Sequence, residues 1–139
     1  MELRLNYPVL LLSKSNNRIY VFTKEKDLKS TNEELFGKIN YSNYYVVDEL
    51  GLMYTINNAF KVKKCGLFGV NPFLKGKQIL IDFEFSSQID KLLLDTIKQE
   101  LVQRIEQDKD YWKLNWNIQE LEAKIISSKT FKEIYLLLK

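Results

Sequence analysis

The sequence contains no histidine among its 139 residues. Histidine is the commonest general base and the commonest protein ligand of transition metals. Its absence excludes Ser-His-Asp and Cys-His catalysis within this chain, and leaves a zinc site only one cysteine and carboxylates to use. We therefore expect no catalytic residues, no metal and no cofactor, and a protein that binds a partner rather than an enzyme.

Cysteine and long apolar runs are equally scarce. Cys65 is the single cysteine, so no disulfide forms within the chain. It is either a nucleophile activated by Lys63 or Lys64 or an inert thiol, and the lack of histidine favours the second. No apolar run approaches the roughly 20 residues that span a bilayer, and the N-terminus shows no secretory signal. These features favour the reducing cytoplasm and no membrane partner.

The composition is that of a folded domain. It is 45% hydrophobic and 28% charged, which is too apolar for a disordered chain. The length fits one domain with a core of its own, and no linker, repeat or low-complexity tract interrupts it. We expect residues 1–139 to form a single domain.

Alternating patterns predict strands in the first two thirds of the chain. The expected strands are 8–14, 18–24, 44–49, 52–56 with a continuation over 59–63, and 78–85. Asn16 and Asn17 favour a first hairpin turn, and Asp48 with Gly51 favours a second. The apolar face of the last strand carries Ile79, Ile81, Phe83 and Phe85.

Repeats of four residues predict helices after Ser87, which is a plausible N-cap. The first helix, 88–108, is expected to bury Ile89, Leu93, Ile97 and Leu101. Further helices are expected over 118–127 and 130–138. In the first half, 27–39 is expected to be a short helix capped by Ser30 or Thr31, with Leu35 and Phe36 facing the core.

Strands first and helices last predict an α+β fold. We expect a mostly antiparallel sheet of about five strands, a short helix in the N-terminal half, and C-terminal helices packed on one face. The apolar face of 78–85 is expected to pack against the 88–108 helix, leaving Asp82 and Glu84 in solvent.

Two carboxylate pairs are the remaining candidates for chemistry. Asp82 with Glu84, and Asp48 with Glu49, either hold magnesium or perform acid–base work, or form a solvated strand face and a turn. Structural carboxylates far outnumber catalytic ones, so the second interpretation is favoured.

A basic stretch with aromatic residues is the preferred partner-binding surface. It contains no acidic residue and carries Lys61, Lys63, Lys64, Phe68, Phe73, Lys75 and Lys77. Such a stretch suits a protein partner or single-stranded nucleic acid, although it lacks arginine, the usual fork for bases and phosphates. The competing surface is the turn with Trp112 and Trp116, which is either a lid on the core or an interface anchor.

Two segments resemble the small immunity proteins of bacterial polymorphic toxin and contact-dependent inhibition systems. One is the hairpin 45–54, an apolar strand, an Asp–Gly turn and a tyrosine-bearing strand. The other is the C-terminal run 120–138, in which 125–134 breaks two short helices. The resemblance implies a cytoplasmic protein that binds and neutralises a cognate toxin domain, and it transfers no site residues. The alternative is a nucleic-acid-binding accessory or regulatory protein that uses residues 61–77.

Overall fold

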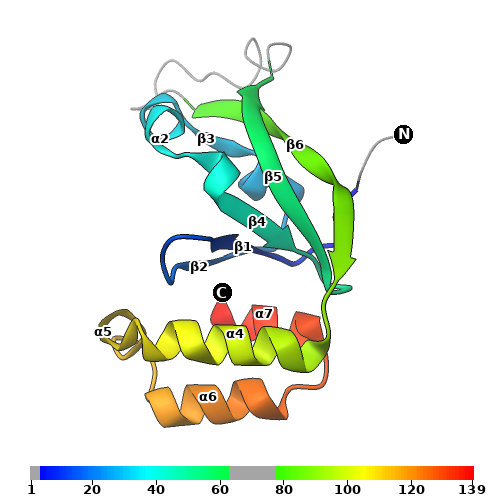
Figure 1. Ribbon diagram of the computed structural model, residues 1–139. Helices are drawn as coiled ribbons and strands as arrows, with labels where there is room; N and C mark the ends of the chain where they lie inside the picture. Colours follow the sequence, from blue (N-terminus) through cyan, green and yellow to red (C-terminus); the bar gives the residue numbers. More distant parts are fainter. Residues whose placement is uncertain (1–3, 63–77) are drawn as a thin grey trace.

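The computed structural model describes residues 4–62 and 78–139, and its framework is a curled antiparallel sheet of six strands. The order across the sheet is β2-β1-β4-β5-β6-β3 (Figure 1). The strands are β1 (Val9–Ser13), β2 (Ile19–Phe22), β3 (Ser30–Asn32), β4 (Tyr44–Val47), β5 (Leu52–Lys61) and β6 (Gln78–Lys91). The predicted α+β class with an antiparallel sheet is confirmed.

Helices form two groups. The short α1 (Glu25–Leu28), α2 (Glu33–Lys38) and the 3-10 turn η1 (Tyr41–Asn43) lie on the strand half of the molecule. The C-terminal group is α4 (Leu94–Glu106), α5 (Lys109–Trp112), α6 (Ile118–Ser127) and α7 (Phe131–Leu138). The Asn117 and Thr130 side chains cap α6 and α7 by accepting from backbone N–H groups three residues on.

Both predicted hairpins are present. β1 pairs with β2, and β4 pairs with β5. The second turn needs Gly51, whose φ of 82° favours glycine. A Cβ there would also lie 2.6 Å from the Phe131 ring, so the turn and α7 approach too closely for any larger residue.

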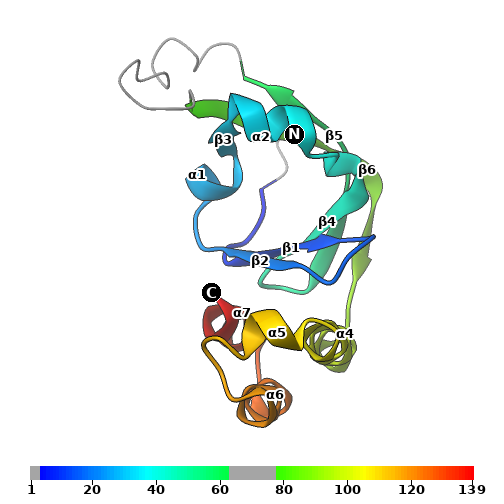
Figure 2. The ribbon, with the colours of Figure 1, turned by 90° about the vertical axis from the view of Figure 1, so that its left-hand side faces the viewer.

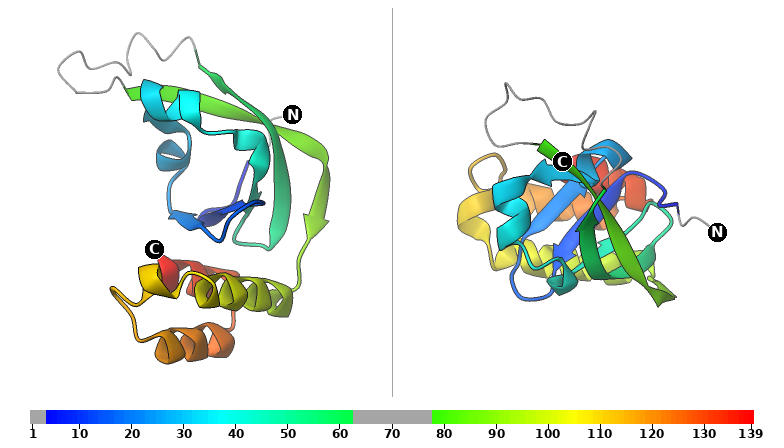
Figure 3. Two further views of the ribbon diagram at one scale, coloured as in Figure 1. Left: turned by 60° about the vertical axis from the view of Figure 1, so that its left-hand side comes forward. Right: turned by 90° about the horizontal axis from the view of Figure 1, so that it is seen from above.

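Strand β1 separates two cores, and all five of its residues are buried. The C-terminal helices pack below β1, β2 and β4, while the rest of the sheet curls above them (Figures 1 and 3). We call the lower one the helix-side core; its buried residues include Leu10, Leu12, Val47, Ile97, Leu101, Ile105, Leu121, Ile125, Ile134 and Tyr135. The upper one, the inner core, contains Val9, Leu11, Leu28, Val46, Tyr54, Ile56, Ile81 and Phe83.

The predicted start of the long helix is wrong. β6 continues to Lys91, and α4 begins only at Leu94. Ile89 pairs with Tyr54 in the β5–β6 ladder, and Leu93 is 74% exposed. Pairing with β5 overrides the four-residue repeat, because a ladder that extends the sheet satisfies the backbone of these residues.

The facing of 78–85 is confirmed but its packing partner is not. Ile81 and Phe83 are buried, so the register has the predicted side inward. They belong to the inner core with Leu28 and Tyr54 rather than packing on α4. Because the sheet curls, the inward face of β6 packs against residues of β1 and β4 in the same sheet and not against the C-terminal helices.

The predicted helix over 27–39 is broken. β3 interrupts it by pairing with β6, with Ser30 opposite Leu80. Asn32, not Ser30 or Thr31, caps α2 by accepting from the Leu35 N–H at 2.7 Å. Leu35 itself is 48% exposed and does not face the core.

Candidate functional site

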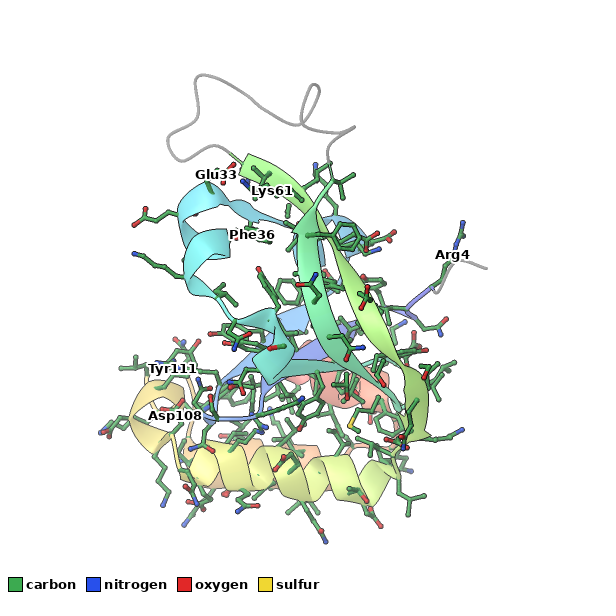
Figure 4. The ribbon with its side chains drawn as sticks, turned by 45° about the horizontal axis from the view of Figure 1, so that its top comes forward. Arg4, Glu33, Phe36, Lys61, Asp108 and Tyr111 are labelled. Carbon is green, nitrogen blue, oxygen red and sulfur yellow. The ribbon has the colours of Figure 1, made fainter. Side chains whose placement is uncertain are left out.

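The preferred basic stretch falls almost entirely outside the described residues, which exclude Lys63, Lys64, Phe68, Phe73, Lys75 and Lys77. Lys61 is described at the end of β5. Its Nζ lies 2.8 and 2.7 Å from the two carboxylate oxygens of Glu33 and 5.9 Å from the ring centre of Phe36 (Figure 4). This lysine therefore has its charge matched within the chain, and it fastens β5 to the start of α2.

Asp48 is a structural carboxylate at the β4–β5 turn. It is fully buried. Its Oδ1 accepts from the N–H groups of Leu50 and Leu52 at 2.9 and 3.0 Å, and its Oδ2 accepts from the backbone and side chain of Asn6. The Tyr135 hydroxyl donates to the Asp48 carbonyl at 3.1 Å. Both carboxylate oxygens are thus committed to holding the turn.

Asp82 is also held in a structural contact. Lys29 Nζ lies 3.1 Å from Asp82 and 2.8 Å from Glu25, and it joins α1 to β6. The buried phenol of Tyr7 has its pKa raised by burial and then by these two carboxylates. Glu84 is exposed. Within 4–62 and 78–139, no three cysteine or acidic side chains converge to hold a metal ion.

The tryptophan turn behaves as a lid. Trp112 is buried in the helix-side core, and Trp116 packs against that core with Lys124 Nζ 5.3 Å from its ring centre. The exposed apolar residues of this turn are its neighbours Tyr111 and Leu114. Tyr111 stacks beneath the Arg18 guanidinium at 5.3 Å, and Figure 4 places it near α5, away from Lys61.

An apolar cavity opens where the curled sheet fails to close. Figure 2 shows α1 and α2 standing opposite β4, β5 and β6, with β2 below them. The cavity, of about 260 Å³, lies between β2 and these short helices. We call it the mouth; it is lined by Leu11, Tyr20, Phe22, Asp27, Leu28, Ser30, Thr31, Leu35, Ile39, Tyr41 and Tyr44.

Aromatic rings connect the mouth to the inner core. The Tyr41 ring lies 6.4 Å from Tyr44, 6.1 Å from Phe36 and 5.4 Å from Phe83, between centroids. These tilted pairs fix the ring positions. The bottom of the mouth is therefore formed by these packed aromatic side chains, whereas Tyr20 at its rim is 42% exposed.

The polar groups of the mouth are few and carry one negative charge. Asp27 is the only charged lining residue, beside the hydroxyls of Ser30 and Thr31. Burial raises the pKa of both Tyr41 and Tyr44, so their phenols remain neutral at neutral pH.

No family model, curated protein or solved structure matches this chain. Among the helices in the described part of the chain, none combines the length and apolarity needed to cross a membrane.

Sequence reasoning missed the mouth because its lining comes from seven separate elements, and from Ile39 after α2, between residues 11 and 44. The available signal was the density of aromatic residues, with Tyr20, Phe22, Tyr41 and Tyr44 close in sequence. The incorrect helix over 27–39 hid it by assigning Leu35 to the core.

Sequence reasoning also missed Arg104, a buried cation in α4 that is 6% exposed. Its guanidinium donates to the carbonyls of Ser13 at 2.7 Å, and of Asn16 and Arg18 at 3.1 Å each. These bonds tie the β1–β2 turn to α4. Two hollows beside α4, of about 360 and 380 Å³, share the lining residues Glu100 and Gln103, and Arg104 lines the second of them.

Proposed function

We propose that this chain is a non-catalytic cytoplasmic binding protein that neutralises a cognate bacterial toxin domain, as the immunity proteins it resembles do. The observation that carries the proposal is the mouth, an apolar opening with Tyr20 and Leu35 exposed at its rim. Exposed aromatic side chains beside a preformed pocket are common anchors of a protein interface.

The carboxylates support binding rather than chemistry. Asp48 and Asp82, the two most plausible acid–base groups, are engaged in the turn and in the α1–β6 contact. A general acid or base needs a lone pair or proton available to a substrate. Asp48 has both oxygens committed, and Asp82 is held by Lys29.

The size of the mouth is compatible with a protein partner. Small-molecule and cofactor pockets typically enclose roughly 300–1,000 Å³, and this cavity is about 260 Å³. It suits one or two side chains of a partner whose remaining contacts lie on the rim. The alternative, nucleic-acid binding, depends on residues 61–77, of which the structure describes only 61 and 62, and Lys61 is paired with Glu33.

The test is binding to the toxin domain encoded beside the gene, measured by calorimetry with purified proteins. The double variant Tyr20→Ala, Leu35→Ala is expected to weaken binding at least about tenfold, since anchors cost about 1–2 kcal/mol or more each. The control Leu114→Ala alters a more exposed leucine at the far turn, 74% against 48% for Leu35, and is expected to leave affinity unchanged.

Two outcomes overturn the proposal. One is the absence of any complex with an adjacent toxin domain. The other is a folded double variant that binds and neutralises the toxin as well as the unaltered protein does.

A further inference from the structure

We infer that the mouth captures the side chain of an arginine on the protein partner. The inference rests on the proposed binding function and adds the chemistry of the contact. It follows from three independent features of the mouth: uncovered aromatic rings, one unmatched carboxylate, and a volume suited to a single long side chain.

The rings of the mouth lack the cations that cover other rings of this chain. Elsewhere Arg18 lies over Tyr111, Lys61 over Phe36 and Lys124 over Trp116, at 5.3 to 5.9 Å. Within the described residues, no cation lies over the mouth rings of Tyr20, Phe22, Tyr41 and Tyr44. Aromatic faces attract organic cations, and guanidinium stacks on them especially well.

The carboxylate of the mouth is likewise unmatched. In the segment 25–38, Glu25 pairs with Lys29, Glu33 with Lys61, and Glu34 with Lys38. Asp27 is the one acid of this segment that forms no salt bridge within the part of the chain the structure describes. It is also the one that lines the cavity. The negative charge of Asp27, unpaired among the described residues, thus lines the cavity that a ligand would enter.

The remaining lining suits arginine more than lysine. Ser30 Oγ donates to the Lys26 carbonyl at 2.7 Å and keeps lone pairs for accepting. Together with Asp27 it offers acceptors to a guanidinium, which presents five N–H donors in a plane. The apolar wall of Leu11, Leu28 and Ile39 suits the methylene stem. An ammonium group is more strongly hydrated and cannot stack in this way.

The test uses Nα-acetyl-arginine N-methylamide as the probe, followed by NMR of the full chain. We expect saturable shifts of the Tyr20, Tyr41 and Tyr44 ring signals. The citrulline counterpart has nearly the same shape without the charge. It is expected to bind about tenfold more weakly, the factor that corresponds to about 1.4 kcal/mol of cation–π and charge attraction.

Asp27→Asn is expected to remove most of the preference for arginine over citrulline, with folding checked by thermal melting. Asp95→Asn makes the same change at another exposed position, in the first turn of α4, and is expected to preserve the preference. Equal binding of both probes by the unaltered protein overturns the inference. So does saturation by tetramethylammonium without saturation by the arginine probe, which would indicate a small organic cation.

The two proposals fail separately. If toxin binding is lost in Tyr20→Ala, Leu35→Ala but unchanged in Asp27→Asn, the mouth is the interface and the arginine inference is wrong. If the arginine probe saturates the mouth and no toxin domain binds, the chemistry of the mouth stands and the proposed function is wrong.

Discussion

The two sides of β1 are closed by different means. On the helix side, α4 and α7, of 13 and 8 residues, lie against the sheet, and α6, of 10 residues, packs behind them (Figure 2). On the inner side, α1 and α2 have four and six residues and leave the mouth open. Longer helices supply packing, whereas short elements on a rigid frame leave surface for a partner. This contrast predicts that the helix side supplies most of the stability and that the inner side supplies the binding surface.

The largest effect is expected at the centre of the helix-side core. Leu101→Ala removes a fully buried side chain of α4 and is expected to lower the free energy of unfolding by about 2–5 kcal/mol, through lost burial and a cavity. Urea denaturation followed by far-UV circular dichroism measures it. A loss below about 1 kcal/mol would show that this side is not the main source of stability.

A smaller loss of stability is expected at Arg104, which holds the β1–β2 turn against α4. Arg104→Met keeps much of the side-chain stem but loses the donors to three carbonyls. We expect a loss of about 2–3 kcal/mol, because hydrogen bonds from charged donors are stronger than neutral ones. Arg18→Met, at an exposed position over Tyr111, is the control and is expected to change stability little. Equal effects of the two would contradict the assigned role.

The hydrogen bond from Tyr135 in α7 to the Asp48 carbonyl in the β4–β5 turn is expected to contribute less to stability. Burial, followed by the charge of Asp48, raises the pKa of Tyr135 and keeps its phenol a donor to the Asp48 carbonyl. Tyr135→Phe is expected to cost about 1–2 kcal/mol, because it leaves that carbonyl without its side-chain donor. Tyr111→Phe, at an exposed tyrosine, should cost much less in the same denaturation experiment. A neutral Tyr135→Phe would argue against this contribution.

Local signals in the sequence predicted much of the helix side. The patterns over 118–127 and 130–138 match α6 and α7, because capping side chains and four-residue repeats act within the helix itself. The hairpin turn at Asp48 and Gly51 was predictable for the same reason. Arg104 was not, because its acceptors lie more than 80 residues away in sequence.

Long-range pairing decided what the sequence did not reveal. Whether Ile89 belongs to a helix or a strand depends on β5, and the break in 27–39 depends on β6. The curl of the sheet decides which face of β6 meets which core. The mouth forms only once these strands have paired and the sheet has curled, so its lining residues make no contiguous motif in the sequence.

The smallest effect on stability is expected at the rim of the mouth, and it bears most directly on the comparison. Leu35→Ala is the same chemical change as Leu101→Ala, made on a side chain that is 48% exposed. A half-exposed leucine contributes little burial and leaves no enclosed cavity, so the free energy of unfolding should change by less than about 0.5 kcal/mol. Denaturation of the two variants side by side measures this difference. A loss above about 1 kcal/mol would mean that Leu35 closes the inner core. The mouth would then be a sealed part of the fold, and a partner would have no exposed leucine to bind there.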